Sequence, residues 1–148
     1  MNIVILCDSK FGNTRSLADA MEAALKADHR VEVRSPSAGL PEPGSVDLLL
    51  VGGPTHAHGA SAPLKTTLGQ VHKGALLGVR SAAFDTRFGM ARILTGSAAG
   101  VATKWLKRAG AMIVAPPESF IVTRTDPPAL IDGELTRAAT WAREVAAA

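Results

Sequence analysis

Apolar runs separated by helical patterns constrain this chain more than any other feature of its sequence. The run Val46–Gly52 is apolar almost throughout, as expected for a strand that is covered on both faces of a sheet. Asn2–Cys7 predicts a second buried strand, and between the two runs Thr14–Ala27 places its apolar residues on one helical face. Strands that alternate with helices favour a parallel sheet with helices on both of its faces.

The same alternation continues to the end of the chain. The 148 residues fit one domain of ordinary size, and we expect a single domain over residues 1–148. Further strands are predicted at Arg30–Arg34, at Gly78–Phe84, and in two pieces separated by Pro116 and Pro117, Ala111–Ala115 and Phe120–Thr123. Further helices are predicted at Ala62–Lys73, Ser97–Ala109 and Asp132–Ala147, with Ser97 capping the second of them.

Composition excludes several classes of protein. Sixteen Lys and Arg against thirteen Asp and Glu give a net charge of +3, and the charges are scattered, so we expect no nucleic-acid binding. No apolar run approaches the roughly 20 residues that span a bilayer, so no membrane span is expected. The start of the chain lacks a basic segment, and the single cysteine suits a reducing compartment, which together predict a cytoplasmic protein. We expect Cys7 to be a small core residue.

Three segments follow predicted strands and should meet at one edge of the sheet, where ligands bind in open α/β sheets. They are 9–14, 53–61 and 85–96. In the first, hydroxyl and amide side chains accompany Gly12, which allows a tight turn, and a helix N-terminus follows. This combination favours an anion site that suits a phosphate. The alternative is that Asn13 or Thr14 only caps the helix.

Other phosphate-binding patterns are absent from the sequence. There is no G-x-x-x-x-G-K-[ST] motif, and no G-x-G-x-x-G follows a strand. A response-regulator interpretation would need an acidic residue at the end of the third strand, where this chain has Gly52 and Gly53.

Two of the segments resemble known loops. S-K-F-G-N-T at 9–14 resembles the phosphate loop of flavodoxins, which commonly runs T/S-x-T-G-N-T. G-G-P-T-H-A-H-G at 52–59 is similar to the P-T-x-x-G loop beside the isoalloxazine ring of flavodoxin-like FMN proteins. The resemblance implies a flavodoxin-like three-layer sandwich with a five-stranded parallel sheet in strand order 2-1-3-4-5, and FMN as cofactor.

The resemblance also implies roles by position. The FMN phosphate would be held by Ser9, Gly12, Asn13 and Thr14. Backbone N–H groups would come from Lys10, Phe11 and Arg15. The flavin ring would be bordered by Pro54, Thr55, His56 and Gly59. The pyrimidine edge of the ring would meet backbone groups of Asp85, Thr86, Arg87, Phe88 and Gly89.

The chain departs from flavodoxins in its aromatic residues and its charge. It has no Tyr, and Phe11 stands where many flavodoxins have a hydroxyl. Any aromatic stack on the ring would have to come from His56, His58 or Phe88. Flavodoxins are usually strongly acidic, whereas this chain is basic, so their choice of partner does not carry over. His56 and His58 lack a third ligand nearby, and no metal is expected.

From the sequence we expect the first of the following three functions, and the other two are alternatives. The first is FMN-dependent electron transfer to a redox partner protein, with no catalytic side chain. The second is an NAD(P)H-dependent FMN quinone reductase, which would make the protein an oxidoreductase enzyme. The third is a flavodoxin-fold binding or scaffold protein that has lost FMN. The sequence leaves open whether the protein is a monomer or a homodimer.

Two further interpretations concern the third segment. Asp85 and Arg87 are expected to pair with each other or to close this loop, and the alternative is a direct ligand role. Met90, Ile93 and Leu94 make the segment unusually apolar, and could fold into the core, cover a ligand or meet a second subunit.

Overall fold

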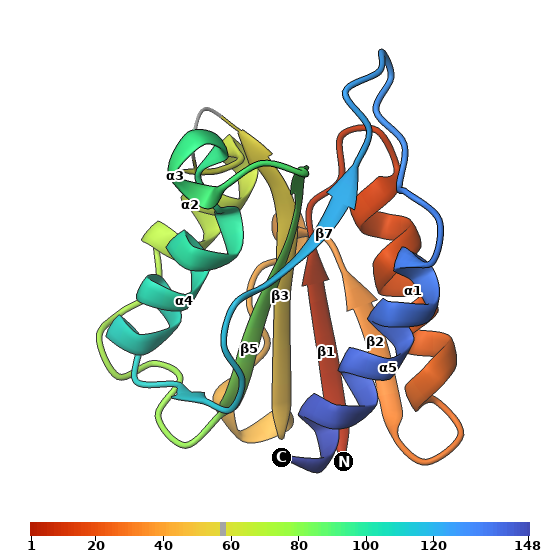
Figure 1. Cartoon of the computed structure of the whole chain (residues 1–148). Helices are drawn as coiled ribbons and strands as arrows, with labels where there is room; N and C mark the ends of the chain where they lie inside the picture. The colour runs from red at the N-terminus through yellow and green to blue at the C-terminus, as the bar shows by residue number, and fades with distance from the viewer. Residues whose placement is uncertain (57–58) are drawn as a thin grey trace.

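The computed structural model describes residues 1–56 and 59–148. Its parallel sheet runs in the order β2 (Arg30–Arg34), β1 (Asn2–Cys7), β3 (Leu48–His56) and β5 (Arg80–Phe88) (Figure 1). The short strand β4 (Gly59–Ala60) pairs antiparallel with the end of β3. Among the described residues, no helix has the length and apolar character needed to cross a membrane.

The fifth position of the sheet is shared by two short strands. β6 (Met112–Ile113) pairs with the start of β5, and β7 (Glu118–Val122) pairs with its end, both in parallel. Pro116 and Pro117 lie between them and have no N–H group to donate to a ladder. The predicted order 2-1-3-4-5 is therefore confirmed, with a fifth strand that is interrupted where the prolines predicted.

Helices cover both faces of the sheet (Figure 1). α1 (Asn13–Leu25) and α5 (Glu134–Ala147) lie together on one face. α2 (Ala62–Gly69), the short α3 (Arg92–Thr95) and α4 (Ala98–Arg108) lie on the other. Two single turns of 3-10 helix, η1 (Pro36–Ala38) and η2 (Pro43–Ser45), occupy the loop between β2 and β3. Because helices form both outer layers, the central strands are buried on both sides, and Leu48–Val51 and Ala82–Phe84 are apolar.

The core under α1 and α5 is built around three aromatic rings. Phe84, Phe120 and Trp141 meet edge to face, with ring centroids 5.9 to 6.3 Å apart. Gly52 pairs with Phe84 in the sheet, and a Cβ atom at Gly52 would lie 2.1 Å from the Phe84 ring. A side chain at this position would overlap the ring. The first glycine of the G-G-P-T segment is thus explained by packing of the core.

Two strands are longer than the sequence predicts. β3 and β5 continue through 53–56 and 85–88, which we expected to be loops. The apolar pattern ends at Gly52 and Phe84, but the backbone pairing does not, since Gly53 pairs with Asp85 and Pro54 with Thr86. The third segment also contains α3, which was not predicted. α2 ends at Gly69, four residues before its expected end at Lys73.

Candidate functional site

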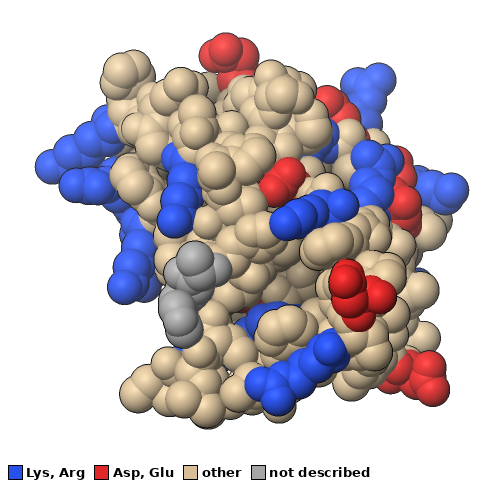
Figure 2. Space-filling model, turned by 90° about the horizontal axis from the view of Figure 1, so that it is seen from above, with Lys and Arg blue, Asp and Glu red and all other residues tan. Residues whose placement is uncertain are grey.

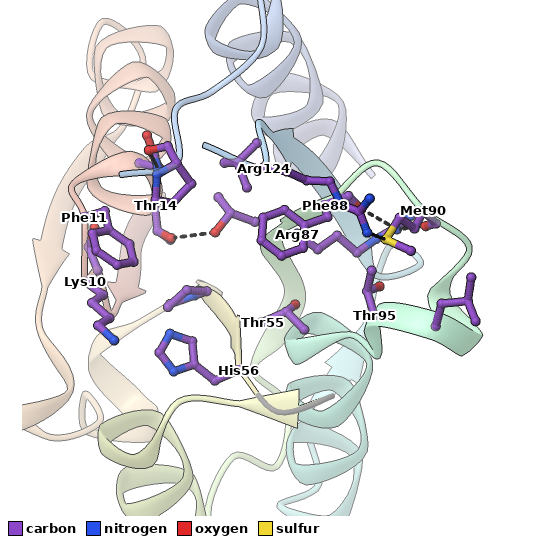
Figure 3. A pocket seen from close by; sticks show the side chains of 17 residues that line it. Lys10, Phe11, Thr14, Thr55, His56, Arg87, Phe88, Met90, Thr95 and Arg124 are labelled. Carbon is purple, nitrogen blue, oxygen red and sulfur yellow. Dashed lines mark hydrogen bonds between the residues drawn. The ribbon is translucent and has the colours of Figure 1, made fainter. Parts of the chain in front are cut away.

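A cavity of about 450 Å3 opens at the carboxyl edge of the sheet. This volume falls within the range of small-molecule sites. Its walls come from the ends of β1, β3 and β5, the start of α1, the α3 segment and the chain that follows β7 (Figure 3). The lining residues are Ser9, Lys10, Phe11, Asn13, Thr14, Pro54, Thr55, His56, Thr86, Arg87, Phe88, Met90, Leu94, Thr95, Val122, Arg124 and Pro128.

The first wall is the loop between β1 and α1. Gly12 immediately precedes the helix with φ of +86°, a conformation that glycine adopts without strain. No side chain caps α1, and the Asn13 amide instead donates to the Pro128 carbonyl at 2.9 Å. Ser9 Oγ accepts a hydrogen bond from the Arg15 N–H group at 3.3 Å. The capping alternative for Asn13 and Thr14 is therefore wrong: both lie at the start of α1 in the cavity lining, and the side chain that accepts a helix N–H group there is Ser9.

Thr14 connects this wall to β5. Its side chain is buried, and its hydroxyl lies 3.3 Å from the hydroxyl of Thr86. Each hydroxyl has one proton to donate and two lone pairs, so one of the pair still has a proton for another acceptor. Both residues line the cavity. The pair therefore places a hydroxyl donor at the base of the site.

The second wall is the end of β3. Thr55 Oγ1 donates to Asp85 at 3.3 Å and accepts from the N–H group of Ala98 at 3.1 Å, so its rotamer is fixed from two sides. Pro54 and His56 are half-buried and line the cavity beside it. In Figure 3, Lys10 and Phe11 lie on one side of the cavity and Arg87, Phe88 and Met90 on the other.

Asp85 lies beneath the cavity and does not line it. Its side chain is fully buried, and its Oδ2 atom accepts hydrogen bonds from Ser97 Oγ at 2.7 Å and from the Ala99 N–H group at 3.0 Å. Ser97 Oγ in turn accepts from the Gly100 N–H group at 3.1 Å, which confirms the predicted cap. A carboxylate at a helix N-terminus is stabilised by the helix dipole. Asp85 therefore holds the start of α4 and closes the base of the third segment, and it does not pair with Arg87.

Arg87 forms the third wall with a set of neighbours. Its guanidinium donates to the carbonyls of Phe88 and Met90, while its buried Nε atom has no partner among the described residues. The Arg124 guanidinium lies 5.8 Å from the centroid of the Phe88 ring and also contacts the sulfur of Met90. Arg87 thus contacts the backbone of Phe88 and Arg124 lies over its ring, while 40% of the surface of Phe88 stays exposed.

The charges around the cavity are mainly positive. Lys10, Arg87 and Arg124 line it, and within residues 1–56 and 59–148 none of them has a carboxylate within 4 Å. Asp8 lies nearby and accepts a hydrogen bond from Ser61. Figure 2, which looks down on this edge, shows Lys and Arg side chains at the margin of the hollow. Such an arrangement favours an anionic ligand.

Several expected site residues lie outside the lining. Gly12, Gly59 and Gly89 lie in adjoining backbone, and Asp85 is buried below. His58 lies outside the described residues. In the described part of the chain, no group of three or more His, Cys, Asp or Glu side chains is arranged to hold a metal ion. Cys7 is buried as expected, and burial raises the pKa of its thiol to about 12.

Sequence reasoning missed the part of the site that comes from the end of the chain. Arg124 and Pro128 follow β7 and reach the cavity because β7 also ends at this edge. No local motif marks them. The only signal was the general rule that segments after parallel strands meet at one edge, and we applied it to three strands and not to the last. Leu94 and Thr95 were within a segment that we considered.

The strand order and the cavity together define a flavodoxin-like fold. Superposition on solved structures agrees: flavodoxin 1 from Bacillus cereus has a TM-score of 0.77 and 17% identity, over 99% of this chain and 98% of that one. A flavodoxin from the domain Archaea has the same TM-score and identity, over 99% and 97%. The rubredoxin oxygen:oxidoreductase of Desulfovibrio gigas has a TM-score of 0.75 and 19% identity over 99% of this chain.

This chain spans only 35% of the length of the Desulfovibrio protein. No protein-family model matches the sequence, and no curated protein sequence matches it significantly. At these identities the likeness establishes the flavodoxin-like fold.

Proposed function

We propose that this protein binds FMN in the cavity at the carboxyl edge of the sheet and transfers electrons to a redox partner. The observation that carries the proposal is the start of α1. Asn13 and Thr14, its first two residues, line a cavity of about 450 Å3 beside the turn at Gly12, and Ser9 Oγ accepts the N–H group of Arg15, the third residue. A helix end of this kind binds phosphate groups through its N–H groups and its dipole.

The residues of the cavity fit both the phosphate and the ring of FMN. Toward a phosphate, the site offers the backbone of 10–14, the Ser9 hydroxyl and the Thr14 hydroxyl. Toward a flat, mostly apolar ring, it offers Pro54, His56 and Phe88. Arg87, whose buried Nε atom lacks a partner among the described residues, lies in the lining on the same side as Phe88. There is no second glycine fingerprint for a pyrophosphate, which favours FMN over FAD.

FMN, when bound, would accept and release electrons one or two at a time. The chain would bind and orient it. Thr14 and the start of α1 would hold the phosphate, and His56 and Phe88 would border the ring. Arg87 and Arg124 would favour negative charge on the reduced ring, by an amount that depends on distance and exposure. No side chain of the site needs to act as an acid or a base.

The test is the cofactor itself. Purified protein should be yellow or should become yellow with added FMN, and mass spectrometry of the extracted cofactor should give FMN. FAD as the main component would show that the site has been misinterpreted. A colourless protein that does not quench FMN fluorescence would favour a binding or scaffold protein with this fold.

A second function is favoured by the cations of the third wall. Arg124 is exposed at the rim and lies beside Phe88, where it could face an anionic second substrate such as NADPH. That arrangement would suit an FMN-dependent quinone reductase. Steady-state oxidation of NADPH in the presence of a quinone separates the two functions, because an electron carrier alone would show no turnover.

A further inference from the structure

Charge is distributed unevenly along this chain. Residues 48–117 contain eight Lys and Arg and a single acid, Asp85, which is buried. The rest of the chain has eight Lys and Arg against twelve Asp and Glu. The first region therefore has a net charge of +7 and the second a net charge of −4, so the total of +3 conceals a strong asymmetry.

Five of the eight cations in residues 48–117 lie on one face, which we call the basic face. It consists of exposed cations on α2, on the turn that follows α2, and on α4, namely Lys65, Lys73, Lys104, Lys107 and Arg108. In Figure 2 the blue side chains gather along the side that carries α2 and α4 in Figure 1. The opposite layer, with α1, β2 and α5, carries most of the acids in the helices and strands.

An apolar knob, α3, lies at the rim of the cavity on the chain segment that leads into α4. α3 exposes 90% of Ile93 and 58% of Leu94, and Leu94 also lines the cavity. Arg92 donates to the Pro117 carbonyl and to Ser119 Oγ, both at 3.1 Å, which fixes α3 against the end of the sheet. Thr95, another lining residue, is followed almost directly by α4.

We propose that the basic face and the α3 knob form the docking surface for an acidic protein. An apolar centre with a charged margin is the usual composition of a protein interface. Cations on one side of the molecule would attract and orient a negatively charged partner before contact. The partner would then lie beside the cavity, and its role as a redox partner rests on the proposed function.

Two features favour a protein over other polyanions. Nucleic-acid sites combine arginine with aromatic side chains that stack on bases. Here four of the five cations are lysines, and the guanidinium of Arg108 already lies 5.3 Å from the centroid of the half-buried Trp105 ring. An anionic membrane surface could be bound by the cations without any apolar residue. This surface also exposes the pair Ile93 and Leu94 on a four-residue helix, which fits a small apolar pocket on a protein better than a bilayer.

The experiment is an NMR titration of the full chain with poly-L-glutamate, at low and at physiological salt. The variant Lys104→Gln, Lys107→Gln, Arg108→Gln removes three charges from the basic face. Glutamine is used in place of glutamate because an acidic side chain at the carboxyl end of a helix would destabilise the helix. The matched control, Lys26→Gln, Arg30→Gln, Arg143→Gln, removes three exposed charges from the opposite layer. Duplex DNA and phosphatidylserine vesicles are tested beside the peptide.

We expect amide shifts to concentrate on α2 and α4 and to fade as salt rises. The basic-face variant should weaken binding about tenfold or more, and the control less than threefold, as expected for a local patch. A second acidic peptide with leucine at every fourth position should bind more tightly, and Ile93→Ser should remove that gain. Equal losses in both triple variants, or no gain from leucine, would overturn the proposal.

Tighter binding of DNA or vesicles through the same residues would also overturn it, in favour of those partners. None of these measurements needs FMN. A protein that fails to bind FMN but binds acidic peptide on α2 and α4 would refute the proposed function and leave this docking surface in place. Binding of FMN without any peptide binding would refute the docking surface and leave the proposed function in place.

Discussion

The hydroxyl oxygens of Thr14 and Thr86 lie 3.3 Å apart at the base of the cavity. One residue belongs to the first turn of α1 and the other to the end of β5, so the contact joins the proposed phosphate wall to the proposed ring wall. Both side chains are nearly inaccessible to solvent. A change at either residue therefore acts on a buried polar pair.

Thr14→Val should weaken FMN binding roughly tenfold or more, because it removes a hydrogen bond worth about 1.5–3 kcal/mol to a charged group. Affinity for riboflavin, which has no phosphate, should be lower than for FMN and should change little in this variant. Fluorescence quenching measures both. Thr140→Val, on the exposed side of α5, is the control. Equal affinities for FMN and riboflavin in the unmodified protein would refute a phosphate site at Thr14.

Arg87→Ala should make the bound flavin harder to reduce. The guanidinium lines the cavity, and a cation close to the ring stabilises the negatively charged reduced form by on the order of 1 kcal/mol. A spectroelectrochemical titration should therefore give a more negative reduction potential for the second one-electron step of the bound flavin in the variant. Arg143→Ala on α5, far from the cavity, should leave the potential unchanged. A second potential that stays constant or rises in Arg87→Ala would show that Arg87 does not tune the flavin.

Gly52→Ala should destabilise the fold by about 1–3 kcal/mol or more, since the new methyl group would overlap the Phe84 ring in a packed core. Urea unfolding followed by circular dichroism measures the loss. Gly44→Ala is a matched control because its Cβ atom would meet no atom within 4 Å and its backbone needs no positive φ. Similar unfolding midpoints for the two variants would contradict the packing role of Gly52.

Glu134→Gln should lower the free energy of unfolding near neutral pH and make that free energy depend less on pH in the acid range. Arg137 hydrogen-bonds the buried carboxylate, which also accepts the Ile121 N–H group at 2.6 Å, and these contacts hold the pKa of Glu134 below that of an ordinary glutamate. The stabilisation is therefore complete above about pH 5 and is lost as the pH falls through the lowered pKa.

Urea unfolding at about pH 7 should show a loss of about 1.5–3 kcal/mol in Glu134→Gln, a difference that narrows by about pH 3. Glu144→Gln changes an exposed acid of the same helix and should have little effect. A constant difference between Glu134→Gln and the unmodified protein across this pH range would indicate that packing, and not ionisation, explains the loss.

The sheet could be predicted because its signals are local. β2 has the predicted bounds, since alternation in Arg30–Arg34 directly reflects its two faces. The interruption of the fifth strand followed from two prolines. The extensions of β3 and β5 could not be predicted, because backbone pairing of Pro54 with Thr86 depends on the neighbouring strand and leaves no pattern in either segment.

The candidate site divides in the same way. The turn at Gly12 and the cap at Ser97 involve residues that are close in sequence, and both were predicted. The hydrogen bonds of Asp85 were harder to predict, since its partners Ser97 and Ala99 lie at the start of α4. Arg124 lies 34 residues from Met90, and only the fold brings it to the cavity. Side-chain chemistry that depends on tertiary contact is not visible in a single sequence.

The aromatic cluster of Phe84, Phe120 and Trp141 gives the molecule a built-in optical probe. Trp141 is buried at the seam between α5 and the sheet, whereas Trp105, the other indole, lies half-buried on the opposite layer. Replacing Trp105 with phenylalanine would leave Trp141 as the one fluorescent tryptophan. Its emission wavelength and fluorescence lifetime would then report on the packing of α5 against the sheet. Energy transfer from that emitter to a yellow chromophore at the sheet edge would then reveal cofactor loading and helix detachment in a single recording.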